Sequence, residues 1–254
     1  MAPLIDLHYS GANTAARQRM IAPIPPESAD ITAWRGDQRK RLIALRESIA
    51  PGQLLEWRVA IDNHLRRGFP GLRGSVVAIC WPYRNEYDAR HLAAQLRSAG
   101  TTILLPVVVA KAAPLQFREW HPGAVMARGP LGIPYPTESP FGQPKVVLLP
   151  MVGFDSAGYR LGYGGGYFDR TLAAAQPRPV VIGVVNELAR MKTIHPQEHD
   201  IPADYVVTER GVYRRYGNEL AFLGAPMERD SPGVPLSSPV CYANSPEVRR
   251  NAGD

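Results

Sequence analysis

The chain has 254 residues, of which 45% are hydrophobic and 20% are charged, and its formal net charge is +6. A chain of this length can bury one substantial core and does not require two domains. No apolar run approaches the roughly 20 residues that a membrane-spanning helix needs, and the N-terminus lacks the basic start and apolar block of a secretion signal. We therefore expect a soluble, cytoplasmic protein without a membrane partner.

The positive charge is compatible with several anionic partners, but its distribution argues against nucleic acid. The basic residues are scattered, and the sequence has neither a lysine-rich tail nor an interleaved aromatic and basic sheet motif. Cys80 and Cys241 are too few and too far apart for a disulfide framework or a zinc site. Small anionic ligands fit this charge, and a nucleic-acid-binding or regulatory module stays open as a weaker alternative.

Residues 1–33 carry scattered prolines and no sustained apolar period, which predicts an extended N-terminal arm. From Trp34 onward, apolar residues recur along one helical stripe that reaches Ile49. At about 100° per residue, three arginines fall together on the edge of that stripe. They are Arg35, Arg39 and Arg46. On the residues alone, they form either the solvated face of an amphipathic helix or a cationic flank.

The middle of the chain alternates apolar runs with helical segments. A second helix is expected after Pro51, and another between Asp88 and Gly100. The apolar runs lack polar alternation, as strands covered on both faces do. These runs are residues 76–81, 103–109, 146–149, 180–185 and 205–207. Repeated strand, helix, strand units predict an α/β fold over residues 34–212, with three layers and a mainly parallel, Rossmann-like sheet.

A glycine-rich loop, GYRLGYGGGYFD, extends from Gly158 to Asp169 between a predicted strand and a predicted helix. Free N–H groups and the positive end of the helix dipole suit phosphate there, and glycines let the backbone approach an anion. The loop has neither a Gly-Lys-Ser/Thr ending nor G-x-G-x-x-G spacing. Arg160 can donate to phosphate oxygens, and Asp169 can hold Mg²⁺. The alternative is a flexible surface loop.

This loop closely resembles the signature of the 5-formyltetrahydrofolate cyclo-ligase family, also called 5,10-methenyltetrahydrofolate synthetases. Other segments resemble the same family in the same order, and the resemblance covers about Trp34 to Gly211. These segments are Trp81-Pro82 with Glu86-Tyr87-Asp88, Leu105-Pro106-Val107-Val108, Phe117-Arg118-Glu119-Trp120, Gly132-Ile133-Pro134-Tyr135-Pro136 and Glu198-His199-Asp200-Ile201-Pro202.

The resemblance implies that 5-formyltetrahydrofolate, with or without a polyglutamate tail, is cyclised to 5,10-methenyltetrahydrofolate with ATP and Mg²⁺, releasing ADP and phosphate. It implies that Arg160, Tyr167 and Phe168 are catalytic and that the helix arginines Arg35 and Arg46 contact ATP. The predicted ATP-binding loop consists of Arg160, Leu161, Gly162, Tyr163, Gly164, Gly165, Gly166, Tyr167 and Phe168. The main alternative is a paralogue that keeps the ATP site and acts on another small molecule.

Glu86 follows the strand that ends at Trp81, on the rim where parallel sheets bind ligands. On the residues alone it is an exposed loop carboxylate, whereas the resemblance gives it a contact with the pterin ring of folate. The resemblance also places Trp81 at the folate-binding edge. Trp120 and Tyr135 could stack on a flat ring of the substrate or simply pack.

His195 and His199 lie among carboxylates, which suggests a transition metal, but the nearby prolines argue against a regular helix that carries metal ligands. Oxygen ligands for Mg²⁺ fit better, and the resemblance places Asp200 at the metal position, together with Asp169. From residue 213 the chain is rich in Pro, Ser and Gly, which predicts a mostly disordered tail over 213–254. Either a monomer or a homodimer is compatible with these features.

Overall fold

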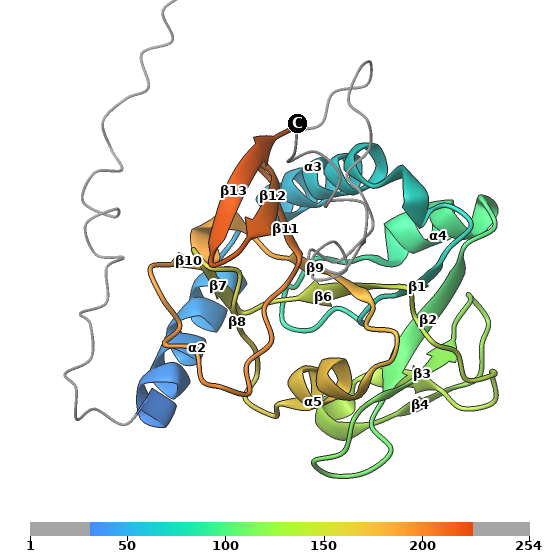
Figure 1. The fold of residues 1–254 in the computed structure, drawn as a ribbon. Helices are drawn as coiled ribbons and strands as arrows, with labels where there is room; N and C mark the ends of the chain where they lie inside the picture. The colour runs from blue at the N-terminus through green and yellow to red at the C-terminus, as the bar shows by residue number, and fades with distance from the viewer. Residues whose placement is uncertain (1–30, 226–254) are drawn as a thin grey trace, which may run out of the picture.

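The computed structural model describes residues 31–225, so the predicted arm at 1–30 and the tail at 226–254 lie outside the described residues. A central sheet is built from β1 (Val76–Ala78), β2 (Thr102–Val107), β3 (Gln116–Glu119), β6 (Val146–Pro150), β9 (Val180–Val184), β11 (Tyr205–Thr208), β12 (Gly211–Tyr216) and β13 (Glu219–Gly224). Their order across the sheet is β13-β12-β11-β9-β6-β1-β2-β3 (Figure 1).

The five central strands, β2, β1, β6, β9 and β11, are parallel to one another. β3 joins one edge antiparallel, and β12 and β13 continue the other edge in the same way. The strand residues Val146 to Leu149 are all buried, since both faces of the sheet are covered. The predicted α/β fold with a mainly parallel sheet is therefore confirmed.

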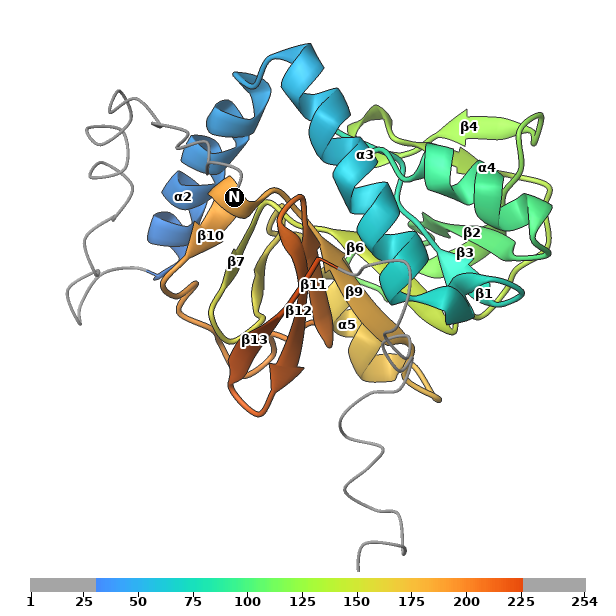
Figure 2. The ribbon, with the colours of Figure 1, turned by 90° about the horizontal axis from the view of Figure 1, so that it is seen from above.

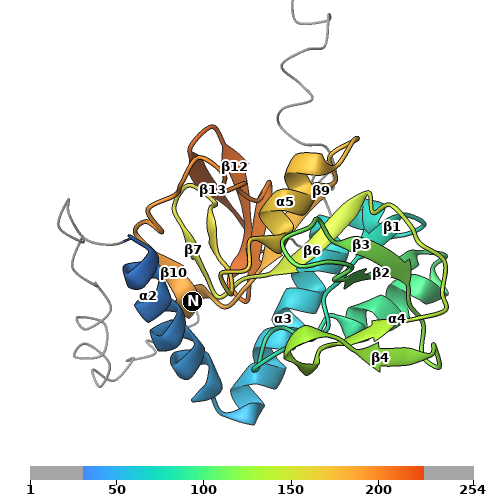
Figure 3. The same cartoon turned by 90° about the horizontal axis from the view of Figure 1, so that it is seen from below.

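The helices are α2 (Ile31–Glu47), α3 (Pro51–Gly68), α4 (Arg90–Ser98) and α5 (Tyr167–Ala174). α3 and α4 lie over one face, where their apolar residues pack with Val146 and Leu148 (Figure 2). α2 and α5 contribute to the core on the other face, with Val147 and Leu149; Figure 3 shows α5 beside β6 and β9. Alternate residues of each strand thus face opposite cores, which produces the three layers.

The chain connections diverge to opposite faces of the sheet between β1 and β6. The crossover from β1 to β2 passes through α4 on one face, whereas the crossover from β6 to β9 passes through α5 on the other face. β1 and β6 are neighbours in the sheet. In open α/β sheets, ligands bind beyond the carboxyl ends of two such strands, where the connections diverge.

Two small sheets were not predicted. One contains β10 (Arg190–Met191), β7 (Gly153–Asp155) and β8 (Arg160–Leu161), and the other contains β4 (Met126–Arg128) and β5 (Pro134–Pro136). The expectation that β6 leads directly into the glycine loop is wrong in one respect. The antiparallel pair β7–β8 comes between them, because Gly158, with φ 84°, allows the tight reversal before Arg160.

The structured region extends further toward the C-terminus than the sequence predicted. The proposed boundary at residue 212 falls inside β12, and β13 extends the sheet to Gly224. Tyr213 and Leu220 are buried in the core, which explains why this hairpin packs against the domain. Within the described residues, no helix is long and apolar enough to cross a membrane.

Candidate functional site

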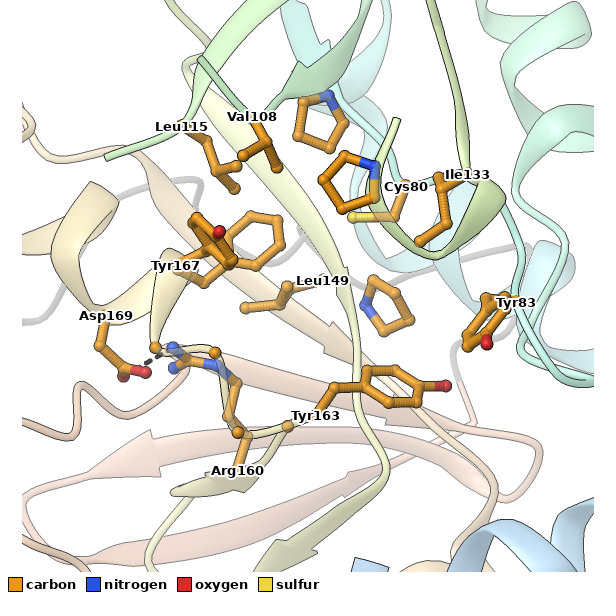
Figure 4. A pocket seen from close by; sticks show the side chains of 18 of the residues that line it. Cys80, Tyr83, Val108, Leu115, Ile133, Leu149, Arg160, Tyr163, Tyr167 and Asp169 are labelled. Carbon is orange, nitrogen blue, oxygen red and sulfur yellow. Dashed lines mark hydrogen bonds and ion pairs between the residues drawn. The ribbon is translucent and has the colours of Figure 1, made fainter. Parts of the chain in front are cut away.

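A cavity of about 300 Å³ lies at the carboxyl ends of β1 and β6, where the chain connections diverge (Figure 4). Cys80 and Trp81 reach it from β1, and Leu149 and Pro150 reach it from β6. The whole segment from Arg160 to Asp169 forms another wall. The size and the mixture of apolar walls with a few polar groups are typical of small-molecule sites.

The glycine loop connects β8 to α5 along this cavity. Gly164 and Gly166 have φ of 91° and 62°, in the left-handed region that other residues rarely adopt. A Cβ atom on Gly164 would lie 3.3 Å from the guanidinium carbon of Arg39. Arg39 in turn donates from Nε to the Gly162 carbonyl at 2.7 Å. The glycines therefore allow the left-handed backbone of the loop and the close approach of the Arg39 guanidinium, which lies against one side of the loop.

We expect Gly164→Ala to lower ATP affinity about 5-fold, the equivalent of about 1 kcal/mol. The added methyl strains the backbone and presses on Arg39. Gly123 is a matched control, because it has the same φ of 91° but open space around it and lies outside the cavity lining. Gly123→Ala should lower the melting temperature but leave ATP affinity unchanged in calorimetry. Equal nucleotide affinities in the two variants would remove Gly164 from the site.

Arg160, a predicted ATP-binding and catalytic residue, lines the cavity. Its side chain is buried, and it donates to the Asp169 carboxylate at 2.6 Å and to the Ile201 carbonyl. Burial lowers the pKa of Arg160, while the Asp169 carboxylate opposes this change. The pair joins the end of β8 to the first turn of α5, so Arg160 is fixed beside the glycine loop.

Arg35 reaches the cavity from α2. It forms an ion pair with Asp200 at 2.5 Å and donates to the Ile194 and His195 carbonyls. Burial would raise the pKa of Asp200, but the hydrogen bonds from Arg35 and the Gln197 amide outweigh it and lower that pKa. Arg35, a predicted ATP ligand, and Asp200, a predicted metal ligand, both line the cavity.

The other two helix arginines have different environments from those predicted. Arg46 lies behind the cavity wall, where it donates to the Arg84 carbonyl at 2.8 Å and to the Tyr163 hydroxyl at 2.7 Å. It is not among the lining residues. Arg39, omitted from the predicted ATP ligands, lines the cavity. Its spacing of four residues from Arg35 was the signal that could have identified it, because such residues share a helix face.

Glu86 is buried at the edge of the cavity, with a side chain only 4% exposed. The Tyr163 hydroxyl donates to its Oε1 at 2.9 Å, and the Tyr83 amide donates to its Oε2 at 3.2 Å. Burial raises the pKa of Glu86, and the Arg46 charge and the two hydrogen bonds oppose the rise. The alternative of an exposed loop carboxylate is therefore wrong.

The aromatic residues divide into two groups. Trp81 and Tyr135 line the cavity, so they can contact a flat ligand. Trp120 packs edge-on against Trp81, with ring centroids 6.0 Å apart, and lies outside the lining. Tyr83 and several apolar side chains complete the walls but were not predicted. These additional residues are Val108, Leu115, Ile133 and Pro134.

The metal candidates are both at the cavity, but each is paired with an arginine. Asp169 accepts from Arg160 and the Ile201 amide through Oδ1, and no described residue bonds to its Oδ2. Both oxygens of Asp200 accept hydrogen bonds from Arg35. The described residues contain no cluster of three or more His, Cys, Asp or Glu side chains that could hold a metal ion. His195 instead packs against Trp34, and the side chain of His199 is 74% exposed.

Comparison with known proteins identifies the family. The model of the 5-formyltetrahydrofolate cyclo-ligase family matches residues 31–209. The chain belongs to this family. It is 30% identical over 175 residues to the 5-formyltetrahydrofolate cyclo-ligase of Escherichia coli K12. That match covers 66% of this chain and 96% of the E. coli protein. It is 34% identical over 160 residues to the cyclo-ligase of Mycolicibacterium smegmatis, which covers 58% of this chain and 82% of that protein.

Solved structures of cyclo-ligases share the fold. The NMR structure of Aquifex aeolicus 5,10-methenyltetrahydrofolate synthetase has a TM-score of 0.63 and 26% identity, covering 74% of this chain and 97% of that one. The synthetase from Mycoplasma pneumoniae has a TM-score of 0.57 at 19% identity, covering 69% of this chain and 98% of that one. The resemblance noted in the sequence is therefore confirmed, and the matched residues contain the whole cavity lining.

Proposed function

We propose that this protein catalyses the ATP-dependent cyclisation of 5-formyltetrahydrofolate to 5,10-methenyltetrahydrofolate, releasing ADP and phosphate. One observation carries the proposal within this family. A single cavity contains a cationic glycine loop, suited to polyphosphate, and the Glu86 carboxylate together with Trp81 and Tyr135, suited to a flat ring with N–H donors.

In this reaction ATP supplies the phosphoryl group that turns the formyl oxygen into a leaving group. The folate N10 then attacks the formyl carbon, and the oxygen departs as phosphate. The protein must align the two substrates and neutralise the charge that spreads over the transferred group. We assign these tasks to Arg160, Arg35, Arg39 and the N–H groups at the start of α5. These residues line one side of the cavity, and the chemistry requires no covalent nucleophile on the protein.

Tyr167 and Phe168 line the cavity directly after the three glycines of the loop. Both residues begin α5, and Tyr167 lies across the cavity from Tyr83 in Figure 4. We assign them to holding the reacting groups close together and away from water. Glu86 accepts hydrogen bonds from the pterin in this proposal, with Trp81 and Tyr135 against the ring.

Mg²⁺ fits the donor set at one position. This ion usually keeps several waters and takes one or two carboxylates together with substrate phosphates. Among the described residues, nothing bonds to the second carboxylate oxygen of Asp169, whereas both oxygens of Asp200 already accept hydrogen bonds from Arg35 and one of them also from the Gln197 amide. We propose that Asp169 holds Mg²⁺ on the phosphates, with Asp200 contributing after rearrangement of its ion pair. The ion would supply positive charge to the phosphate oxygens.

We expect Asp169→Asn to raise the Mg²⁺ concentration needed for half-maximal activity about 10-fold, because one charge-assisted ligand is lost. Asp200→Asn should raise it less, because that carboxylate is occupied by Arg35. Titrations of activity against Mg²⁺ at fixed ATP measure both effects. If neither substitution changes the Mg²⁺ dependence, the ion is held by other groups.

The proposed function is tested with purified protein, 5-formyltetrahydrofolate, Mg²⁺ and ATP, by following the absorbance of the methenyl product. We expect product only when all three additions are present, with one ADP formed for each methenyl group. A protein that binds ATP but neither binds nor converts 5-formyltetrahydrofolate would contradict the proposal. That result would favour a paralogue that acts on another small molecule.

A further inference from the structure

A chain of hydrogen-bonded polar groups joins α2 to the substrate side of the cavity through the glycine loop. Arg46 donates from Nη2 to the Tyr163 hydroxyl at 2.7 Å, and this hydroxyl donates to Oε1 of Glu86 at 2.9 Å. The Arg46 and Glu86 side chains are 7% and 4% exposed. Tyr163 therefore stands between a buried cation and a buried carboxylate.

The direct contact between the two charges is too long to be a hydrogen bond. Nη1 of Arg46 lies 3.8 Å from Oε1 of Glu86. Hydrogen bonds between nitrogen and oxygen are typically 2.7–3.2 Å long. The hydroxyl is consequently the hydrogen-bonded link between them. Tyr163 is itself 39% exposed, but the two charged side chains that its hydroxyl joins are buried, so loss of the hydroxyl leaves the Glu86 carboxylate with one donor fewer.

The turn that carries Glu86 is held from the same helix. Arg84 and Asn85 have φ of 51° and 58°, which is unusual for an arginine. Arg46 donates from Nε to the Arg84 carbonyl, and the Arg84 side chain pairs with Glu47 at 2.7 Å. With the turn fixed by α2, the Tyr163 hydroxyl is the contact through which the glycine loop can act on Glu86.

We propose that Tyr163 is a positioning residue whose hydroxyl is a hydrogen-bonded relay between Arg46 and Glu86 and holds that carboxylate in the orientation that the substrate requires. The inference rests on the proposed function only for the identity of the substrate. It also gives Arg46 a role in supporting Glu86 from behind the cavity wall, in place of the ATP contact predicted from the sequence.

Loss of the Tyr163 hydroxyl should change the pH at which Glu86 ionises. The titratable and charged groups around Glu86 are Arg46 from α2, Tyr163 from the glycine loop, Tyr83 from its own turn and Cys80 from the end of β1. Burial raises the pKa of Glu86, and the Tyr163 hydrogen bond lowers it. Removing the hydroxyl therefore raises that pKa further, so ionised Glu86 is lost at a higher pH as the solution is acidified.

The test is a titration of the Glu86 carboxyl by carbon-13 NMR in ligand-free protein, with the resonance assigned by Glu86→Gln. Tyr163→Phe should raise the pKa of Glu86, and Tyr216→Phe should not. Tyr216 is a matched control because it is a half-exposed tyrosine on β12, outside the cavity lining. An unchanged Glu86 titration in Tyr163→Phe would overturn the proposal.

A second measurement separates the relay from a merely structural role. Calorimetry should show folate binding to Tyr163→Phe about 10-fold weaker at pH 7, with a smaller loss of ATP affinity. The loss should grow as the pH falls. Equal losses of both affinities at every pH would indicate a disturbed loop and contradict the relay. If the wild type bound no folate, the proposed function would fail, whereas the NMR titration would still decide the role of Tyr163.

Discussion

Arg160→Ala is expected to weaken ATP binding about 10- to 100-fold, because a charge-assisted hydrogen bond to phosphate is worth about 1.5–3 kcal/mol. Turnover should fall further, since charge on the transferred phosphoryl group spreads during the reaction. The structure adds a second cost. Asp169 and the Ile201 carbonyl both lose their arginine partner, so the start of α5 is no longer fixed to β8. Calorimetry with ATP and single-turnover kinetics measure the two effects.

Loss of a partly buried ion pair also destabilises the fold, so a matched variant is needed. Arg190 pairs with Glu187 at 2.6 Å and lies over the rings of Phe154 and Tyr213, outside the cavity lining. Arg190→Ala should lower the melting temperature as Arg160→Ala does, but should leave ATP affinity unchanged. If Arg160→Ala retained the ATP affinity of the wild type, the phosphate site would have to lie elsewhere.

Glu86→Gln is expected to weaken folate binding about 10-fold or more, because the charge is lost and an amide presents donors where the pterin requires acceptors. The substitution conserves size, so the Tyr83 turn has no steric reason to move. ATP binding should survive, since Glu86 accepts hydrogen bonds from the Tyr163 hydroxyl and the Tyr83 amide and from neither Arg160 nor the loop glycines. Calorimetric titrations with each substrate compare the two affinities in one preparation.

Glu47→Gln is the control for this experiment. Glu47 supports the same turn through Arg84, but both side chains are about 40% exposed, and such pairs contribute little. Its folate affinity should stay within about 2-fold of wild type. Equal folate affinities in Glu86→Gln and wild type would exclude Glu86 from the site. A joint loss of folate and ATP affinity would instead indicate a general folding defect.

The sequence predicted the parts of the fold that depend on local pattern. Uninterrupted apolar runs identified the central parallel strands, and the glycines before Tyr167 identified the loop that precedes a helix. The strands β7 and β8 were missed because they contain only three and two residues. The pair β12–β13, with six residues in each strand, was missed because its stability depends on tertiary packing. The burial of Phe154 and Leu220, which fixes these strands, becomes visible only in the folded core.

The sequence also predicted those parts of the candidate site that depend on local motifs. The signature segment supplied the lining from Arg160 to Asp169, and the spacing of the arginines indicated a cationic helix face. Sequence could not determine which arginine reaches the cavity, because the register of α2 depends on its packing. Arg39 faces the glycine loop, whereas Arg46 turns toward the carbonyls behind Glu86. The apolar side chains of Val108, Leu115 and Ile133 come from loops, whose paths depend on tertiary contacts.

The central step of the proposed reaction is phosphoryl transfer to the formyl oxygen, which then leaves as phosphate. Its most direct test uses 5-formyltetrahydrofolate labelled with oxygen-18 in the formyl group, with ATP and Mg²⁺. Mass spectrometry of the released phosphate should find one labelled oxygen for each methenyl group formed. Unlabelled phosphate, with the oxygen-18 recovered in water, would contradict this account.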